Sequence, residues 1–333
     1  MIRVLGGGWY GCHLTAELAA HGFQVELHEA RDRLFEGASG ANPARLHQGF
    51  HYPRSRLTRA ACLDHAERFL AAYGQLTRAV PLNIYAVASE ESLVDFGTFR
   101  QVLQGEVPFV PLYDPREFGL RHVEGAVLTG ERHLVIDEAR RHFEAKIGHL
   151  VTYGSRPAVV DDGRYQLTID CTFCAMDSEA IDRYEPCITV LLEGPTDRAV
   201  TIMDGPFPSL YPWNEQLGLN SLTSAKFTPL SKTCRSYDEA QHQLDTVTSD
   251  ELAARMSDML GQLAHFWPGV RDHYQIADFR LAVRAMPKSA ADARLVDVVS
   301  IGEHAIRVRA GKIDAVFRAE ALVLEHCSRC SVL

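Results

Sequence analysis

The sequence lacks the features of several specialised classes of protein. It has no apolar run near the roughly 20 residues that a membrane-spanning helix needs. Its opening residues show none of the charged, apolar and small-residue regions of a secretion signal. Cysteine is sparse, with eight among 333 residues, so a disulfide scaffold is not indicated. We therefore expect a folded cytoplasmic chain with mostly reduced thiols and no integral membrane segment.

Positive charge is also in short supply. Lys and Arg number 34 against 43 Asp and Glu, which gives a formal net charge of −9. Because nucleic-acid binding needs clustered cationic side chains, this balance argues against nucleic acid as a partner. The hydrophobic fraction of 46% is ordinary for a folded protein. The length suits one large domain or two closely packed ones.

Two cysteine pairs have the spacing of metal ligands, Cys171-x-x-Cys174 and Cys327-x-x-Cys330. Compact four-cysteine zinc sites separate their pairs by roughly 15–20 residues. Here the separation is far larger, so we expect no metal site.

A glycine motif near the N-terminus carries the strongest functional signal. The apolar run at residues 2–5 predicts a strand, and Gly6-x-Gly8-x-x-Gly11 follows it and opens a predicted helix over residues 9–21. Such glycines permit a tight turn, a close approach of backbone to a pyrophosphate, and close packing of helix on strand. The N-terminus of the helix offers N–H groups to the phosphates. The motif therefore predicts a dinucleotide site.

An acidic residue stands where such a site needs one. A second strand is predicted at residues 23–28, and Glu29 follows it. A carboxylate at this point can accept hydrogen bonds from a ribose diol, which favours a free 2′-hydroxyl over a 2′-phosphate. The motif by itself leaves FAD and NAD open.

The rest of the chain predicts a nucleotide-binding domain that is interrupted by a sheet. Patterns typical of helices and strands alternate at both ends of the chain, and the middle is rich in strands. Helices are expected at 56–73, 90–103, 137–150, 249–266 and 311–326, and strands at 82–88, 165–170, 275–284, 295–301 and in several short pieces over 187–224.

The segment 38–55, together with the preceding strand–helix–strand unit, resembles the D-amino-acid-oxidase-like family of FAD-dependent oxidoreductases. That family includes glycine oxidase, L-2-hydroxyglutarate dehydrogenase and glycerol-3-phosphate dehydrogenase. Its members carry a Ser-Gly-x-Asn stretch, here Ser39 to Asn42, and some branches carry His-x-Gly-x-x-Tyr, here His47-x-Gly49-x-x-Tyr52. The resemblance implies FAD as the cofactor, with this loop running along the pyrophosphate toward the isoalloxazine.

The resemblance also implies a fold and a set of cofactor contacts. The fold class is α/β plus α+β, with a Rossmann-like FAD-binding domain at 1–75, 130–180 and 287–333 and a mostly antiparallel substrate domain at 76–129 and 181–286. The expected cofactor-binding residues lie in the glycine motif, the ribose-binding acid, the polar loop and the last glycine turn: Gly6, Gly8, Trp9, Tyr10, Gly11, Glu29, Ser39, Asn42, Arg45, Leu46, His47, Gly311, Lys312 and Ile313.

Four residues are candidates for the chemistry. Arg284 aligns best with the arginine that holds the substrate carboxylate in this family, with Arg280 as an alternative on the same strand face. The opposing interpretation of Arg284 is a strand-end ion pair. Tyr211 is a candidate second carboxylate contact or a strand aromatic. His47 is a candidate general base or a hydrogen-bond partner of flavin or backbone, and Tyr52 shares its loop.

These expectations combine into one function. We expect an FAD-dependent oxidoreductase that oxidises a C–N or C–O bond of a small polar, carboxylate-bearing substrate by hydride transfer to flavin N5. The electrons then pass to dioxygen or another acceptor. An NAD-dependent dehydrogenase and a non-catalytic flavin-binding protein remain the alternatives, and the sequence does not indicate an oligomeric state.

Overall fold

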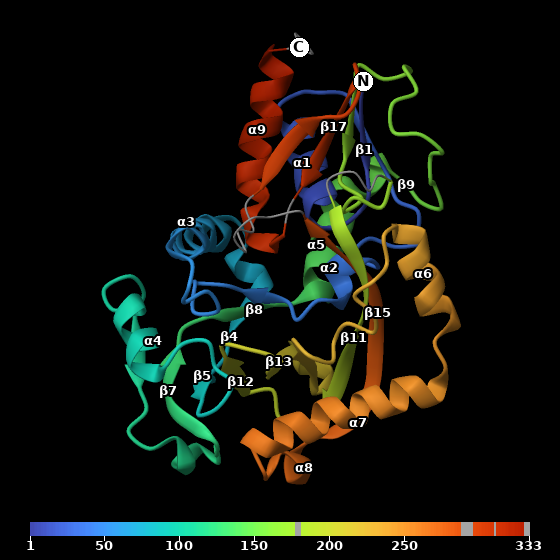
Figure 1. Ribbon diagram of the computed structural model, residues 1–333. Helices are drawn as coiled ribbons and strands as arrows, with labels where there is room; N and C mark the ends of the chain where they lie inside the picture. The colour runs from blue at the N-terminus through green and yellow to red at the C-terminus, as the bar shows by residue number, and fades with distance from the viewer. Residues whose placement is uncertain (177–180, 288–295, 310, 330–333) are drawn as a thin grey trace.

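The fold consists of two large β-sheets joined by a small third one (Figure 1). The computed structural model describes residues 1–176, 181–287, 296–309 and 311–329. One large sheet lies near the two ends of the chain and the other lies at the opposite end of the molecule. Among the described residues, no helix has the length and apolar character to cross a bilayer.

The six-stranded sheet is built around the glycine motif. Its order is β16-β17-β10-β1-β2-β9, parallel except for the β16–β17 pair. Helices α1 (Trp9–Ala20), α5 (Ile136–Ile147) and α9 (Val316–Arg329) pack with it around a single apolar core. The strand bounds are β1 Ile2–Leu5, β2 Val25–His28, β9 Val151–Thr152, β10 Leu167–Asp170, β16 Asp297–Ser300 and β17 Ala305–Arg309.

The eight-stranded sheet has the order β15-β11-β14-β13-β12-β5-β7-β6 and is antiparallel except for the β12–β5 pair. Alternate residues along each strand build an apolar face, on which α7 (Ser249–Phe266) and α8 (Val270–His273) pack. The strand bounds are β5 Leu82–Ala88, β6 Phe109–Pro111, β7 Val123–Thr129, β11 Ile181–Glu193, β12 Arg198–Met203, β13 Pro208–Asn214, β14 Leu219–Ser224 and β15 Gln275–Pro287.

The opposite face of this sheet bears an apolar cluster around Tyr85, Val87 and Met203, and elsewhere it is polar and meets the loop that follows β2. Thr189 of β11 donates to the carbonyl of Ala41, and Arg45 donates to Ser209 of β13. The segments between carry α2 (Ala38–Ala41), the three-stranded sheet β3-β8-β4 and α3 (Arg56–Tyr73). This small sheet has the bounds β3 Arg45–Leu46, β8 Arg132–Leu134 and β4 Thr77–Ala79. The polar loop thus lies between the two large sheets.

The remaining elements cover the periphery. Helices α4 (Phe96–Leu103) and α6 (Tyr237–Thr246) flank the eight-stranded sheet. Short 3-10 turns occur at Gly74–Leu76, Pro115–Phe118, Gly148–Leu150, Glu215–Leu217 and Ile313–Ala315.

The predicted combination of a parallel sheet and a mostly antiparallel one is confirmed. The helix expected at 90–103 begins only at Phe96, because Asp95 accepts a hydrogen bond from the Thr98 N–H and caps it there. Helix α6 was not predicted. The domain boundaries stay a prediction, and β4 lies in the range assigned to the substrate domain while pairing with β8.

Candidate active site

The three glycines of the motif form a tight turn in which an added Cβ would come close to other atoms at every one of the three positions. Gly6 has φ +95°, and a Cβ on it would lie 2.8 Å from the carbonyl oxygen of Cys171. A Cβ on Gly8 would lie 2.7 Å from Ser39 Oγ, and one on Gly11 only 1.8 Å from the Gly6 carbonyl oxygen. The turn therefore presents bare backbone at the N-terminus of α1, which is the cradle that a pyrophosphate requires.

Glu29 and Ser39 lie against this turn. One carboxylate oxygen of Glu29 accepts the Gly7 N–H at 2.5 Å, and the other accepts the Arg31 N–H at 2.8 Å. Ser39 Oγ accepts the Trp9 N–H at 3.1 Å, and the first turn of α1 contains no acidic residue. An anion can therefore use the positive end of the helix, with Glu29 at hand for a ribose. These residues fit FAD and would hold its pyrophosphate and ribose.

Several of the predicted cofactor residues support the loop through their side chains. Trp9 is buried, with its indole edge-on to the rings of Phe35 and Phe69. Asn42 Nδ2 donates to the carbonyl oxygen of Ala38 at 2.9 Å and thereby closes α2, while Leu46 is buried in the core. These side chains hold the loop in place by packing and by a helix cap. Contacts of their backbone with a cofactor stay a prediction.

The loop after β3 and the last glycine turn, at residues 311–313, meet in one cluster. The centroid of the His47 ring lies 5.5 Å from the centroid of the His51 ring and 5.7 Å from that of the Tyr52 ring. Lys312 Nζ lies 3.9 Å from the centroid of the Tyr52 ring. The structure thus brings Lys312 together with His47 and Tyr52, so predicted site residues from two distant parts of the sequence meet here.

The last glycine turn, which begins at Gly311 and precedes α9, is hydrogen-bonded to α1 and α3. Tyr10 donates through its hydroxyl to the Lys312 carbonyl at 2.5 Å, and Lys312 Nζ donates to Cys62 Sγ at 2.5 Å. Burial raises the pKa of Cys62 to about 11, which Lys312 only partly offsets. Burial likewise raises the pKa of Asp314 to about 6. Ile313 and Gly311 flank Lys312, and their half-buried positions leave this backbone near the cluster.

Sequence analysis missed Glu131, a buried carboxylate in the connection between β7 and β8. One of its oxygens accepts the Gln48 N–H at 2.7 Å, and the other accepts the Tyr85 hydroxyl at 2.5 Å. The first of these oxygens also lies 3.8 Å from His47 Nδ1. Burial raises the pKa of Glu131, opposed by Arg45. A lone acid in a turn gives no periodic or motif signal.

Arg45 and Tyr211 lie inside the polar face of the eight-stranded sheet. The Arg45 guanidinium donates to the Tyr85 hydroxyl at 3.0 Å and to Ser209 Oγ at 2.5 Å, and it lies 4.1 Å from the centroid of the Tyr211 ring. The Tyr211 hydroxyl accepts from Asn83 Nδ2 at 2.9 Å. Both side chains are engaged within the sheet, so a contact of either with substrate or flavin stays a prediction.

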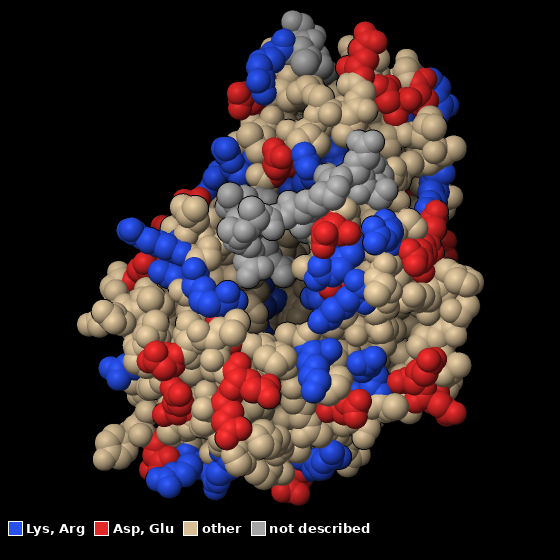
Figure 2. Space-filling view, viewed as in Figure 1, with Lys and Arg blue, Asp and Glu red and all other residues tan. Residues whose placement is uncertain are grey.

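Arg284 projects from β15 on the same face but pairs within the sheet. Its guanidinium donates to one oxygen of the buried Glu185, with Nε at 3.0 Å and Nη2 at 2.5 Å, and Arg183 Nε donates to the other oxygen at 2.8 Å. Arg280 pairs with Asp278 and lies over the Trp213 ring. The carboxylate-binding role of Arg284 stays a prediction. Figure 2 shows Lys and Arg side chains beside a hollow in the middle of the molecule.

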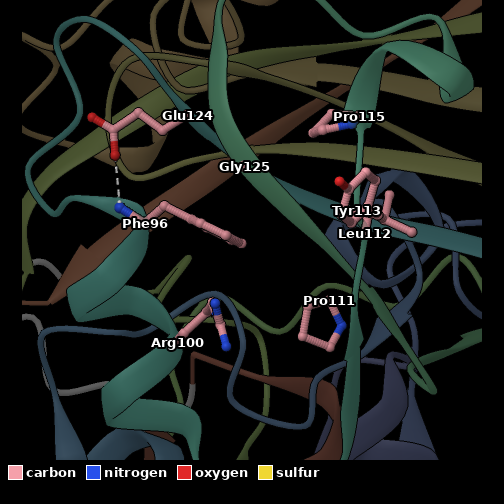
Figure 3. A pocket seen from close by; sticks show the side chains of 8 residues that line it. All are labelled: Phe96, Arg100, Pro111, Leu112, Tyr113, Pro115, Glu124 and Gly125. Atoms are coloured by element: carbon pink, nitrogen blue, oxygen red, sulfur yellow. Dashed lines mark hydrogen bonds between the residues drawn. The ribbon is translucent and has the colours of Figure 1, made fainter.

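A separate open pocket of about 380 Å³ lies at the other edge of the eight-stranded sheet (Figure 3). Phe96, Arg100, Tyr113 and Glu124 are among the residues that line it. No predicted site residue takes part in it. In the chain as described, no group of three or more His, Cys, Asp or Glu residues could hold a metal ion; Cys330 of the second cysteine pair lies outside the described residues.

Comparison with known proteins identifies the fold and the cofactor. A model of the family described as FAD dependent oxidoreductase (DAO) matches residues 1–162. The FAD-dependent monooxygenase FPY4 of Fusarium mangiferae is 34% identical over 336 residues, which cover 97% of this chain and 90% of that protein. The chain belongs to this FAD-dependent oxidoreductase family. The predicted FAD-binding fold and FAD rather than NAD as cofactor are thereby confirmed.

Further relatives agree with this assignment. The FAD-dependent monooxygenase kojA of Aspergillus flavus is 30% identical over 334 residues, covering 88% of this chain and 78% of that protein. Glycine oxidase from Geobacillus kaustophilus superposes with a TM-score of 0.73 at 13% identity, over 98% of this chain and 94% of that one. L-alpha-glycerophosphate oxidase from Mycoplasma pneumoniae superposes with a TM-score of 0.69 at 12% identity, over 96% and 93%. The structural matches show a shared fold.

Proposed function

We propose that this enzyme oxidises a C–N or C–O bond of a small polar substrate that bears a carboxylate. When bound, FAD supplies the acceptor for the hydride. The observation that carries the proposal is the cluster of His47, Tyr52 and Lys312, in which the first two residues belong to the same polar loop as Ser39, which contacts the N-terminus of α1. Removing a hydride from an alcohol or amine also releases a proton, and an imidazole can accept it near neutral pH.

The polar face of the eight-stranded sheet supplies the substrate side in this proposal. Arg284 and Arg280 project from one face of β15, since alternate residues of a strand share a face. A guanidinium can hold a carboxylate through two parallel hydrogen bonds. Binding a substrate this way requires Arg284 to share or exchange its present contact with Glu185. We place the enzyme in the cytoplasm, with dioxygen or another acceptor taking up the electrons.

Monooxygenation is a second candidate, favoured by the names of the two relatives at 34% and 30% identity. A monooxygenase inserts one oxygen atom of dioxygen into its substrate and takes two electrons from an external reductant such as NADPH. The oxidation proposed above needs no such reductant, because the substrate itself supplies the electrons. This difference in electron source separates the two candidates.

The test is anaerobic reduction of the FAD-loaded enzyme by a panel of amino acids, amines and 2-hydroxy acids. We expect at least one of them to bleach the visible absorbance of the flavin without NADPH. The proposal fails if no compound does so. Consumption of NADPH together with one ¹⁸O atom from labelled dioxygen in the product would establish the second candidate instead.

A further inference from the structure

Glu131 is a buried acid next to the cluster of His47, Tyr52 and Lys312, and it has no part in the function proposed so far. The Glu131 side chain is 0% exposed, and the carboxylate has no direct route to solvent or to a substrate. Burying a carboxylate costs several kcal/mol unless hydrogen bonds and opposite charges offset it. An uncharged side chain of similar size would fill the same space without that cost. The charge at this position therefore calls for an explanation in terms of its neighbours.

Glu131 is fixed at its backbone carbonyl and at both carboxylate oxygens. Asn83 Nδ2 donates to its backbone carbonyl at 3.0 Å and anchors the turn. The Tyr85 hydroxyl donates to Oε2, and that hydroxyl accepts in turn from Arg45. The Gln48 N–H donates to Oε1. Since Gln48 directly follows His47, this last bond ties the backbone of the loop after β3 to the acid.

The same Oε1 atom faces His47. It lies 3.8 Å from Nδ1, within ion-pair range, and contacts of this kind shorten when a substrate completes a site. An acid on one ring nitrogen selects the tautomer that carries its proton there and leaves the other nitrogen as proton acceptor. We propose that Glu131 is a positioning residue for His47, holding the proton on Nδ1 so that Nε2 accepts the proton of the substrate. The role of His47 in this proposal rests on the proposed function.

Charged and titratable groups surround the pair on every side. Arg45 and Tyr85 approach Glu131 from the eight-stranded sheet, His51 and Tyr52 flank His47 on its own loop, and Lys312, Asp314 and Cys62 face the cluster from the last turn and α3. Burial raises the pKa of Glu131, while Arg45 and Lys312 favour its charged form.

The test is the tautomer and titration of His47 in the FAD-loaded protein labelled with ¹⁵N-histidine, with the His47 signals assigned from H47N. We expect wild type to show Nδ1 protonated. In E131Q we expect a mixture of tautomers and a titration midpoint lower by about one pH unit, because a neutral amide no longer stabilises the imidazolium. E215Q is the matched control, since it removes a carboxylate 2.9 Å from Nε2 of a different buried histidine, His133. It should leave the His47 signals unchanged.

The loaded enzyme supplies a second readout. E131Q should reduce its flavin about 10–100-fold more slowly, with the acid limb of the pH profile moved to lower pH, as expected for a residue that orients another. If E131Q does not fold, the Glu131 carboxyl ¹³C signal in H47N against wild type takes its place, and its titration should shift.

A His47 tautomer and midpoint that are identical in wild type and E131Q would overturn the proposal, as would an unshifted Glu131 titration in H47N. Failure of the proposed function gives a different result. The tautomer would still depend on Glu131, while no substrate of the panel would reduce the flavin.

Discussion

Gly8→Ala should separate cofactor binding from folding. The backbone of Gly8 has φ −83° and ψ −172°, which any residue can adopt. The added Cβ would meet only Ser39, with Oγ at 2.7 Å and Cβ at 3.6 Å. A serine side chain can rotate away, giving up the hydrogen bond that it accepts from the Trp9 N–H. We expect a loss of about 1 kcal/mol in the free energy of unfolding.

The loss of free energy of FAD binding should be larger than the loss of free energy of unfolding. The new methyl group occupies the approach of a pyrophosphate to the bare backbone of the turn. Losing one hydrogen bond to a charged group costs about 1.5–3 kcal/mol, which corresponds to roughly 10–100-fold weaker binding. Gly11→Ala is the contrasting variant, because its Cβ would lie 1.8 Å from a backbone oxygen that cannot rotate away. There we expect a loss of stability of about 3 kcal/mol.

Two measurements decide the outcome. Urea unfolding of the FAD-free variants gives the stability of each, and titration with FAD followed by flavin fluorescence gives the affinity. Wild-type FAD affinity in Gly8→Ala would refute the assignment of this turn as the phosphate site. Equal destabilisation by Gly8→Ala and Gly11→Ala would refute the distinction between a movable serine and a fixed carbonyl.

Three further predictions concern separate parts of the molecule. Arg284→Ala should raise the KM for the substrate at least about tenfold with flavin content retained. Unchanged kinetics in this variant, together with a raised KM in Arg280→Ala, would assign the carboxylate-binding role to Arg280. The hydrogen bond from His13 lowers the pKa of Glu320, so this carboxylate stabilises the fold above its unfolded pKa and loses that effect as the pH falls through the folded value. Glu320→Gln should therefore cost about 1 kcal/mol at pH 7 and nothing at the acid end of a urea series, and a constant difference would contradict this. Trp9→Ala should cost about 3–5 kcal/mol in urea unfolding, and a stability equal to wild type would show that the indole is not a core element.

Elements with strong local signals could be predicted from sequence almost to the residue. Helices α3 and α7 have the predicted bounds, and they begin there because Ser55 and Thr248 cap their first turns through side-chain hydrogen bonds. The strand–helix–strand unit was equally accessible, since glycines at fixed spacing allow one compact turn. Helix α6 was missed because its apolar contact with the sheet rests on only two buried residues, Ala240 and Leu244.

The site was predictable only where a motif marks it. Glu131 takes its hydrogen bonds from Gln48 and Tyr85, which lie 83 and 46 residues away in the chain. Such a pairing exists only once two sheets and their connections have packed. The same applies to Arg45, which the loop motif assigned to the cofactor and which donates to Tyr85 and Ser209 of the sheet.

Net charge gives a poor guide to the chemistry of this site. The chain as a whole carries −9, yet Arg45 and Lys312 lie among the buried acids Glu131 and Asp314, and three separate segments supply them. In a poorly solvated site, each charged side chain strongly affects the charge state of its neighbours. Because Glu131 Oε1 lies 3.8 Å from His47 Nδ1, the proposed orientation of the imidazole depends on this one buried acid and not on the net charge of the chain.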